Sequence, residues 1–418
     1  MAPKILSSLL LASLAAAVVS ARNCKNLTIP LSLSAQNMDF TLKAPANDIE
    51  VTNFVLNSGR AGANYADEIL SENKATTPSP QPTASPTRAR AARCRFSLAT
   101  NPLYSRQAKS IPSPLSQRAI PDSSPADKSY KPNPTQPNLY TNIHPPPPDG
   151  AAFDRTYWDF PFHAYNYSYA NAALARNYSV FFFDRPGIGE STRGDPVAAI
   201  QSSLELSALR ALTAKLRRGS VRGISARYER VVHVGHSYGS AQTYALTAAH
   251  PDDGTSDAVA LTGFSQGLGT YVGNFLFGGN FVLAGAGYGP GYITCGDVSA
   301  VQTNFFAPDN FDPDILQATY ATSAPTAVGE LLTIGSLTTT NNSFTGPVLV
   351  ITGERDGAFC GGNCYVSEPS IPDQTGNSFT NTTSFEAFVV PGAGHGLNLE
   401  YTAQATYAKI LDFFDKSV

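Results

Sequence analysis

Short apolar runs alternate with helical apolar patterns along the second half of the chain. The run at 178–184 is apolar up to its last residue, as expected of a strand that is buried on both faces. Because helical segments separate such runs, the pattern predicts an α/β fold with a mainly parallel central sheet and helices on both faces. The other predicted strands are 230–235, 257–262, 347–352 and 385–390.

Three helices are predicted between or after these strands. Asp195 and Pro196 supply an N-cap and a first-turn proline, and apolar residues then recur at helical spacing as far as Leu216. A helix of small residues follows Ser237 directly and ends near His250. The last helix has one apolar face, which is made by Ala403, Tyr407, Ile410, Leu411 and Phe414.

The stretch before Gly150 lacks such a pattern. Residues 78–148 hold 16 of the chain's 31 prolines, with many Ser, Thr and Gln residues. This composition predicts that residues 74–149 are largely disordered. Residues 88–118 contain seven basic and no acidic residues, which is typical of a polyanion-binding patch or of a solvated linker. The Pro/Ser-rich setting favours the linker.

Composition places the chain among globular proteins. Hydrophobic residues make up 42% of the 418 positions, which is enough for one large core or two smaller ones and excludes full-length disorder. Lys and Arg total 29 against 32 Asp and Glu, so the formal net charge is -3. We therefore expect no nucleic-acid partner and no general attraction to anionic membranes.

The N-terminus has the features of a secretory signal peptide over residues 1–21. Lys4 supplies a positive charge, residues 5–19 are apolar, and small residues at 19–21 offer a cleavage site. About 15 apolar residues are few for a membrane span, which needs roughly 20; an uncleaved anchor is the alternative. We expect a secreted, extracellular protein without a stable membrane anchor.

A secreted protein can carry N-glycans on its sequons and disulfides between its cysteines. Five sequons would carry glycans where they are exposed; their asparagines are Asn26, Asn166, Asn177, Asn341 and Asn381. Five cysteines allow at most two disulfides; they are Cys24, Cys94, Cys295, Cys360 and Cys364. The expected disulfide joins Cys360 to Cys364, because glycines between them let the loop close. A metal site is the weaker alternative, since this single pair supplies too few ligands for zinc.

The strongest chemical signal is the sequence Gly235-His236-Ser237-Tyr238-Gly239, which fits the pattern G-x-S-x-G. It follows a predicted strand and precedes a predicted helix, which is the context of a nucleophile elbow, where a strained turn exposes the serine hydroxyl. The alternative is an ordinary turn in which Ser237 caps the helix.

A serine nucleophile needs a base to accept its proton and an acid to orient the base. Two predicted strands are followed by Asp356 and His395, and the carboxyl ends of parallel strands meet at one edge of the sheet. We therefore predict a triad of Ser237, His395 and Asp356. Glu354 is an alternative acid, and the alternative bases are His233, His236 and His250.

With these motifs the chain resembles the α/β-hydrolase superfamily, and more narrowly secreted fungal proteins with the α/β-hydrolase fold. The resemblance implies N-terminal strands at 22–73, a core at 150–418 and a cap at about 264–346. In the motif that starts at Asp184, it implies that this residue bonds at the strand end and that Gly187 and Gly189 permit the turn. The residues that carry the resemblance lie at 184–191, 235–239, 353–356 and 392–395.

The oxyanion hole is where the chain departs from the family. The family forms it from the backbone N–H after the nucleophile, here Tyr238, and from a second N–H in an earlier loop. Ala151 is the best remaining second donor, but Asp149 stands where the family has a histidine, and prolines precede it. Either the hydrolase lost an early strand, or residues 74–149 reflect a mis-assembled coding sequence; we favour the second hypothesis, which transcript sequencing tests.

The predicted cap is rich in glycine and aromatic residues, which would form either an apolar substrate pocket or the cap's own core. The prediction is a serine hydrolase that cleaves a small or medium apolar carboxylic ester, without metal or organic cofactor. The alternative is a secreted ligand-binding protein with an impaired oxyanion hole. The cap aromatics are Phe264, Tyr271, Phe275, Phe277, Phe281, Tyr288 and Tyr292.

Overall fold

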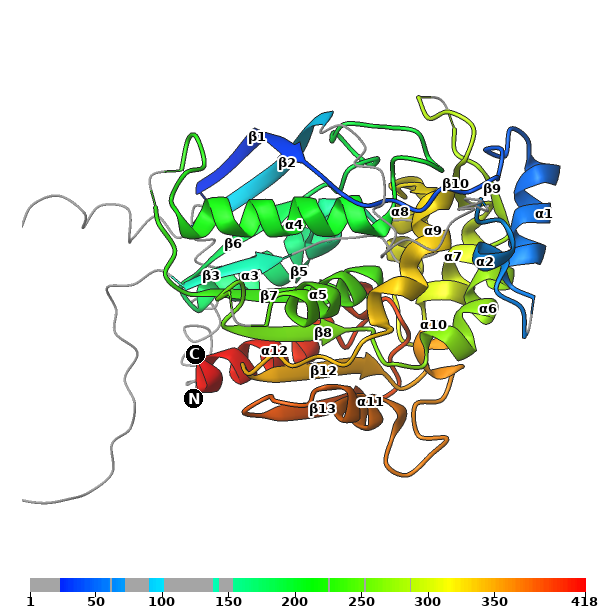
Figure 1. The fold of residues 1–418 in the computed structure, drawn as a ribbon. Helices are drawn as coiled ribbons and strands as arrows, with labels where there is room; N and C mark the ends of the chain where they lie inside the picture. The colour runs from blue at the N-terminus through cyan, green and yellow to red at the C-terminus, as the bar shows by residue number, and fades with distance from the viewer. Residues whose placement is uncertain are drawn as a thin grey trace, which may run out of the picture.

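A central sheet of eight strands organises the protein (Figure 1). The computed structural model describes residues 23–60, 62–71, 90–100, 138–142, 153–224, 226–251, 253–285 and 287–418. All neighbouring strands from β6 to β13 are parallel, whereas β1 and β2 are antiparallel to their neighbours. In spatial order the strands are β1 (Asn23–Leu33), β2 (Arg90–Thr100), β6 (Tyr178–Phe183), β3 (Asn138–Asn142), β7 (Val231–His236), β8 (Ala258–Thr262), β12 (Val348–Gly353) and β13 (Phe385–Val390).

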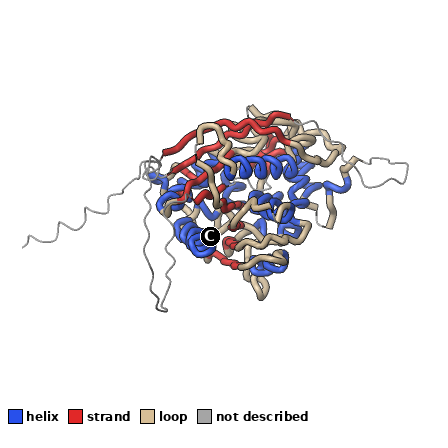
Figure 2. The backbone as a smooth tube through the Cα atoms, turned by 60° about the vertical axis from the view of Figure 1, so that its left-hand side comes forward, coloured by secondary structure: helices blue, strands red, loops and turns tan. Residues whose placement is uncertain are grey.

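Helices cover both faces of this sheet, so that the strands lie between helical layers (Figure 2). The predicted mainly parallel sheet with flanking helices is therefore confirmed. The helices α3 (Tyr169–Ala175) and α12 (Ala403–Ser417) pack together on one face, and α4 (Ser202–Arg217) and α5 (Tyr238–Ala249) pack together on the other.

The five strands predicted from apolar runs are all present, but one helix starts later than expected. Asp195 caps a separate turn, because its Oδ1 accepts the N–H groups of Val197 and Ala198 at 2.9 and 2.8 Å. Helix α4 then begins only at Ser202. The capping signal at Asp195 was genuine, but it serves a turn rather than the helix.

The N-terminal part differs from the strands predicted at 22–73, since only β1 is a long strand there. Helix α1 (Asp48–Ser58) follows, with Asn47 as its N-cap, and α2 (Tyr65–Glu68) comes next. Helix α1 buries Val51, Phe54 and Val55 and contacts β9 (Phe281–Leu283). An amphipathic segment that can bury one face against the cap is more stable as a helix than as a further strand.

Two stretches of the segment predicted to be disordered are strands of the central sheet, so that prediction is wrong for β2 and β3. Strand β3 lies between β6 and β7 and pairs in parallel with both. Its sequence, NLYTN, has no apolar run; its backbone instead satisfies the hydrogen-bonding groups of two buried neighbours. The rest of residues 74–149, and the predicted signal peptide at 1–21, lie outside the described residues.

The chain between β8 and β12 forms a separate layer at the carboxyl ends of the strands, on the right of Figure 1. This layer is where the cap was predicted, and we call it the cap. Its small sheet has the order β11-β10-β9. Besides β9, its elements are α6 (Leu268–Gly278), β10 (Tyr292–Cys295), α7 (Val298–Phe305), α8 (Pro313–Ala321), β11 (Thr326–Ala327) and α9 (Val328–Thr333).

Candidate active site

Ser237 lies in a tight turn between β7 and α5. Its backbone has φ of 53° and ψ of -119°, a conformation that L-residues rarely adopt. The turn is so close that a Cβ at Gly235 would lie 2.4 Å from the carbonyl oxygen of Gly239. The N–H of Ser237 donates to the carbonyl of Thr262 at 2.8 Å, which ties the turn to the end of β8. Gly235 is therefore required by the turn in which the serine sits.

The three predicted triad side chains are in contact with one another. His395 Nε2 lies 2.8 Å from Ser237 Oγ, and His395 Nδ1 lies 2.6 Å from Asp356 Oδ2. Asp356 follows β12 and His395 follows β13, so parallel strand ends bring the groups together. Ser237 and Asp356 are fully buried and His395 is 1% exposed.

Asp356 is fixed on both sides of its carboxylate. One oxygen faces His395, and Oδ1 accepts the N–H of Phe359 at 2.8 Å, which caps α10 (Gly357–Cys360). The predicted disulfide between Cys360 and Cys364 is confirmed and closes the loop that follows. This loop holds the acid in one orientation toward the imidazole.

His233, His250 and Glu354 do not reach Ser237 in this arrangement. Both ring nitrogens of His233 face hydroxyl groups, Thr213 Oγ1 at 3.0 Å and Ser256 Oγ at 2.9 Å. Burial lowers the pKa of His233 to about 3, so this ring stays neutral. His250 lies near Asp253 with Nδ1 at 3.6 Å from its carboxylate, and Glu354 accepts the N–H of Gly392 at 2.9 Å.

His236 packs directly against the triad. Its Nδ1 lies 3.0 Å from Thr262 Oγ1, and its ring stacks on Tyr157 with centroids 4.7 Å apart. The His236 and His395 rings are 4.9 Å apart and tilted. His236 thus lies beside the imidazole of His395, whereas Ser237 Oγ is paired with His395.

Tyr238 directly follows Ser237 and is the first residue of α5. The first N–H groups of a helix have no acceptor within it, so this backbone donor is free to serve a ligand at the turn. The Tyr238 side chain points elsewhere, since its hydroxyl contacts Ser202 Oγ at 2.8 Å and its ring lies 5.0 Å from the Arg185 guanidinium. Ala151, the predicted second donor, lies outside the described residues.

Three buried phenylalanines enclose the His395 ring. Phe359 and Phe305 stack on it at 5.6 and 5.9 Å, and Phe275 from α6 meets it edge-on at 6.0 Å. Of the predicted cap aromatics, Phe275 therefore reaches the site, whereas Phe264 packs on Tyr244 and Phe359. The cap therefore supplies an apolar wall to the site, and Phe264 anchors its start to the main core.

Sequence reasoning did not identify Phe305, Phe359 or Glu400 as parts of this site. Glu400 is buried, and its carboxylate accepts the N–H of Gly394, the residue before His395. An acid that follows Leu397 and Leu399 closely was the available signal. Nothing in the sequence pattern placed the two phenylalanines beside His395.

The motif at Asp184 has a structural role, as predicted. The buried carboxylate accepts the N–H groups of Arg155 and Glu190 at 3.2 and 3.0 Å and also pairs with the Arg155 guanidinium. Burial raises the Asp184 pKa to about 6. Gly187 and Gly189 have φ of 98° and 53°, in agreement with a turn that only glycine adopts easily.

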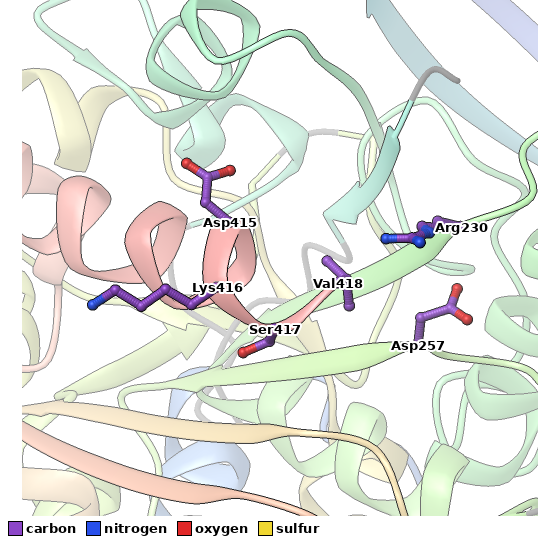
Figure 3. Close-up of a pocket in the computed structure, with 6 residues that line it drawn as sticks. All are labelled: Arg230, Asp257, Asp415, Lys416, Ser417 and Val418. Atoms are coloured by element: carbon purple, nitrogen blue, oxygen red, sulfur yellow. The ribbon is translucent and has the colours of Figure 1, made fainter. Parts of the chain in front are cut away.

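One hollow in the described part of the chain is remote from Ser237. It has a volume of about 480 Å³ and lies at the starts of β7 and β8, whereas Ser237 follows the end of β7 (Figure 3). Its walls mix acidic and basic groups and include the C-terminal residue. The lining residues are Arg230, Asp257, Asp415, Lys416, Ser417 and Val418. It has no triad residue, so we do not assign the chemistry to it.

Among the described residues, no group of three or more His, Cys, Asp or Glu side chains could hold a metal ion. No helix in the same ranges is long and apolar enough to cross a membrane. Cys295 is buried, and the side chains of Cys24 and Cys94 lie outside the described part.

Comparison with known proteins identifies the class. Residues 143–409, more than half of the chain, match the family model described as the alpha/beta hydrolase family. The protein therefore belongs to the α/β-hydrolase family, and the predicted superfamily and fold are confirmed. A comparison with curated protein sequences found no match.

Solved structures of similar chains carry several different names. A bromoperoxidase from Bacillus anthracis is 15% identical, with a TM-score of 0.45 over 78% of this chain and 96% of that chain. A thermophilic esterase from Thermogutta terrifontis is 15% identical, with a TM-score of 0.43 over 67% and 90%. Epoxide hydrolase A from Mycobacterium thermoresistibile is 14% identical, with a TM-score of 0.44 over 78% and 96%. We base the family assignment on the family match alone.

Proposed function

We propose that the protein is a secreted serine hydrolase that cleaves a small or medium apolar carboxylic ester. The observation that carries this proposal is the pair of contacts made by His395, to Ser237 Oγ at 2.8 Å and to Asp356 Oδ2 at 2.6 Å. A serine hydroxyl becomes nucleophilic when a neutral imidazole takes its proton, and the aspartate holds that imidazole in the required tautomer.

The reaction proceeds through an acyl-enzyme. Ser237 Oγ attacks the ester carbonyl as His395 Nε2 takes its proton, and the N–H of Tyr238 donates to the oxyanion. We assign the second donation to Ala151. His395 then protonates the leaving alcohol, and afterwards it removes a proton from the water that attacks the acyl-enzyme and releases the acid.

Apolar walls support an uncharged ester as the substrate. Phe275, Phe305 and Phe359 surround His395, and all three side chains are buried. A charged or strongly hydrated group would lose its hydration beside these rings without gaining polar partners. Serine at the elbow also disfavours the branches of the family that attack with a carboxylate. Thioesters and peptides share the acyl chemistry and are the next substrates to test.

Secretion and glycosylation are part of the proposal. The asparagines of all five sequons are exposed, which is the condition for a glycan at each of them; they are Asn26, Asn166, Asn177, Asn341 and Asn381. The disulfide between Cys360 and Cys364 also suits an oxidising compartment. Expression in a secretory host, followed by enzymatic removal of N-glycans, should reduce the apparent mass.

Labelling with a fluorophosphonate probe tests the proposed nucleophile. The folded protein should be labelled, and Ser237→Ala should not, because the probe phosphonylates only an activated serine, with loss of fluoride. Ser336→Ala is the matched control, since Ser336 is an exposed serine of the cap. Absence of labelling in a folded wild-type protein would contradict the proposal and favour a non-catalytic ligand-binding protein.

A further inference from the structure

Glu400 is a buried acid that the proposed mechanism does not use. Its side chain is fully buried in the loop between η5 (Leu397–Leu399) and α12, close behind His395. Burying a carboxylate is costly unless hydrogen-bond donors replace its water. Burial raises the Glu400 pKa to about 8, and the nearby Asp356 charge acts in the same direction. A group held at such a cost needs an explanation.

The partners of Glu400 come from two parts of the molecule. Its Oε1 accepts the N–H of Ala307 at 2.6 Å, and its Oε2 accepts the N–H of Gly394 at 2.8 Å. Asn310 Nδ2 donates to Oε2 at 3.2 Å. Gly394 directly precedes His395, whereas Ala307 and Asn310 belong to the cap. We call residues 391–396, which carry His395, the histidine loop. The Glu400 carboxylate joins this loop to the cap through three donors.

The histidine loop and the cap approach each other too closely here for a side chain between them. A Cβ at Gly394 would lie 2.6 Å from the backbone nitrogen of Ala307, and one at Gly396 would lie 2.9 Å from the carbonyl oxygen of Phe305. The N–H of Gly396 donates to that same carbonyl at 2.6 Å. Both neighbours of His395 are thus bonded to partners in or beside the cap, and the Phe305 ring stacks on the imidazole between them.

We propose that Glu400 is a positioning residue, which fixes the His395 imidazole for proton transfer by holding Gly394 against the cap segment 305–310. This inference rests on the proposed function. It also gives the cap segment a role, because residues 305–310 then help to hold His395 in place. Proton transfer depends steeply on geometry, and a displacement of about 1 Å costs on the order of 100-fold in rate.

The test is the ester-hydrolysis kinetics of Glu400→Gln in the full-length protein at pH 9, above the Glu400 pKa of about 8, where the carboxyl group is ionised. The amide has nearly the same shape, but it has only one acceptor oxygen and turns an NH2 group toward backbone donors. We expect kcat to fall about 10- to 100-fold with KM changed less than about twofold. The matched control is Glu386→Gln, whose carboxylate is 41% exposed and pairs with Lys409 on the surface; its kinetics should equal those of wild type.

Each outcome either supports or overturns the positioning role of Glu400. A folded Glu400→Gln protein with wild-type kcat, or with only KM raised, would overturn the positioning role. If Glu400→Gln does not fold, Asn310→Ala, which removes one donor and leaves the carboxylate in place, decides instead: a lower kcat at constant KM supports the role, and an unchanged kcat overturns it. If the wild type shows no Ser237-dependent turnover, both the proposed function and this inference are overturned. If the wild type is active and the variant is unaffected, this inference alone is overturned.

Discussion

His395 is constrained on every side in this protein. Its two ring nitrogens face Ser237 and Asp356, aromatic rings stack on it, and its backbone neighbours are bonded to partners in or beside the cap. An imidazole that cannot turn keeps the tautomer and direction that proton transfer needs. These contacts are why we propose His395, rather than another histidine, as the base.

Replacing the acid should separate the roles of Asp356 and Glu354. Asp356→Asn should lower kcat about 10³- to 10⁴-fold, because the amide no longer selects the required imidazole tautomer. Glu354→Gln should stay within about twofold of wild type, because its carboxylate bonds Gly392 and not His395. Steady-state ester hydrolysis measures both. A larger loss in Glu354→Gln than in Asp356→Asn would reverse the assignment.

Sequence reasoning brought Ser237, His395 and Asp356 together because each follows a strand whose carboxyl end is predictable. Glu400 could not be found in the same way. Its proposed role depends on two donors in the cap, the Ala307 N–H and the Asn310 side-chain amide, which lie about 90 residues earlier in the chain, and no sequence period links them. Phe305 escaped prediction for the same reason, since its contact with His395 depends on how the cap docks.

The strands that could be predicted from the sequence are the ones buried on both faces of the sheet. Strands β6, β7, β8 and β12 are fully buried, and the apolar runs in their sequences predicted them. Strand β3 carries a polar sequence and is a strand because it lies between two partners. Tertiary pairing overrode local composition in that case. The β2 and β3 positions in the sheet also weigh against the idea that all of 74–149 is foreign to the fold.

The tight turn that carries Ser237 leaves no room for a side chain at Gly235. Gly235→Ala should lower the free energy of unfolding by about 1–3 kcal/mol, because the new Cβ would lie 2.4 Å from backbone atoms that cannot move aside cheaply. Gly335→Ala is the matched control, since a Cβ there meets nothing within 4 Å. Urea unfolding at one pH measures both. Equal stability of the two variants would show that the turn has more room than the structure gives it.

The whole molecule encloses the side chains of the proposed triad. Ser237 and Asp356 have no exposed surface, and the cap lies over the carboxyl ends of the strands that carry them (Figure 1). Such enclosure strengthens electrostatic interactions within the site. The sequence predicted the class, the sheet and the place of the cap, because these depend on repeated local patterns. It missed helices α1 and α2, whose stability depends on packing against other parts of the fold.

Stability of the whole molecule should depend on His233 in acid. The folded protein holds the His233 pKa near 3, below the ordinary 6.5, so only the unfolded chain takes up the proton between these values. Stability is therefore lost as the pH falls through 6.5, by about 2 kcal/mol at pH 5.

Comparison of wild type with His233→Gln isolates this effect, because Asp184 and Glu400, whose pKa values are raised, titrate in both proteins. Urea unfolding at pH 8 and pH 5 should show wild type losing about 2 kcal/mol relative to the variant. A difference that does not vary with pH would mean that His233 is protonated in the folded state.

Trapping the acyl-enzyme tests most directly whether Ser237 is the nucleophile. The protein should be mixed with p-nitrophenyl butyrate, quenched rapidly in acid, digested and analysed by mass spectrometry. We expect a butyryl group on the peptide that contains Ser237, and none in Ser237→Ala. Turnover with the acyl group on another residue, or a folded protein that neither turns over the ester nor carries an adduct, would contradict it.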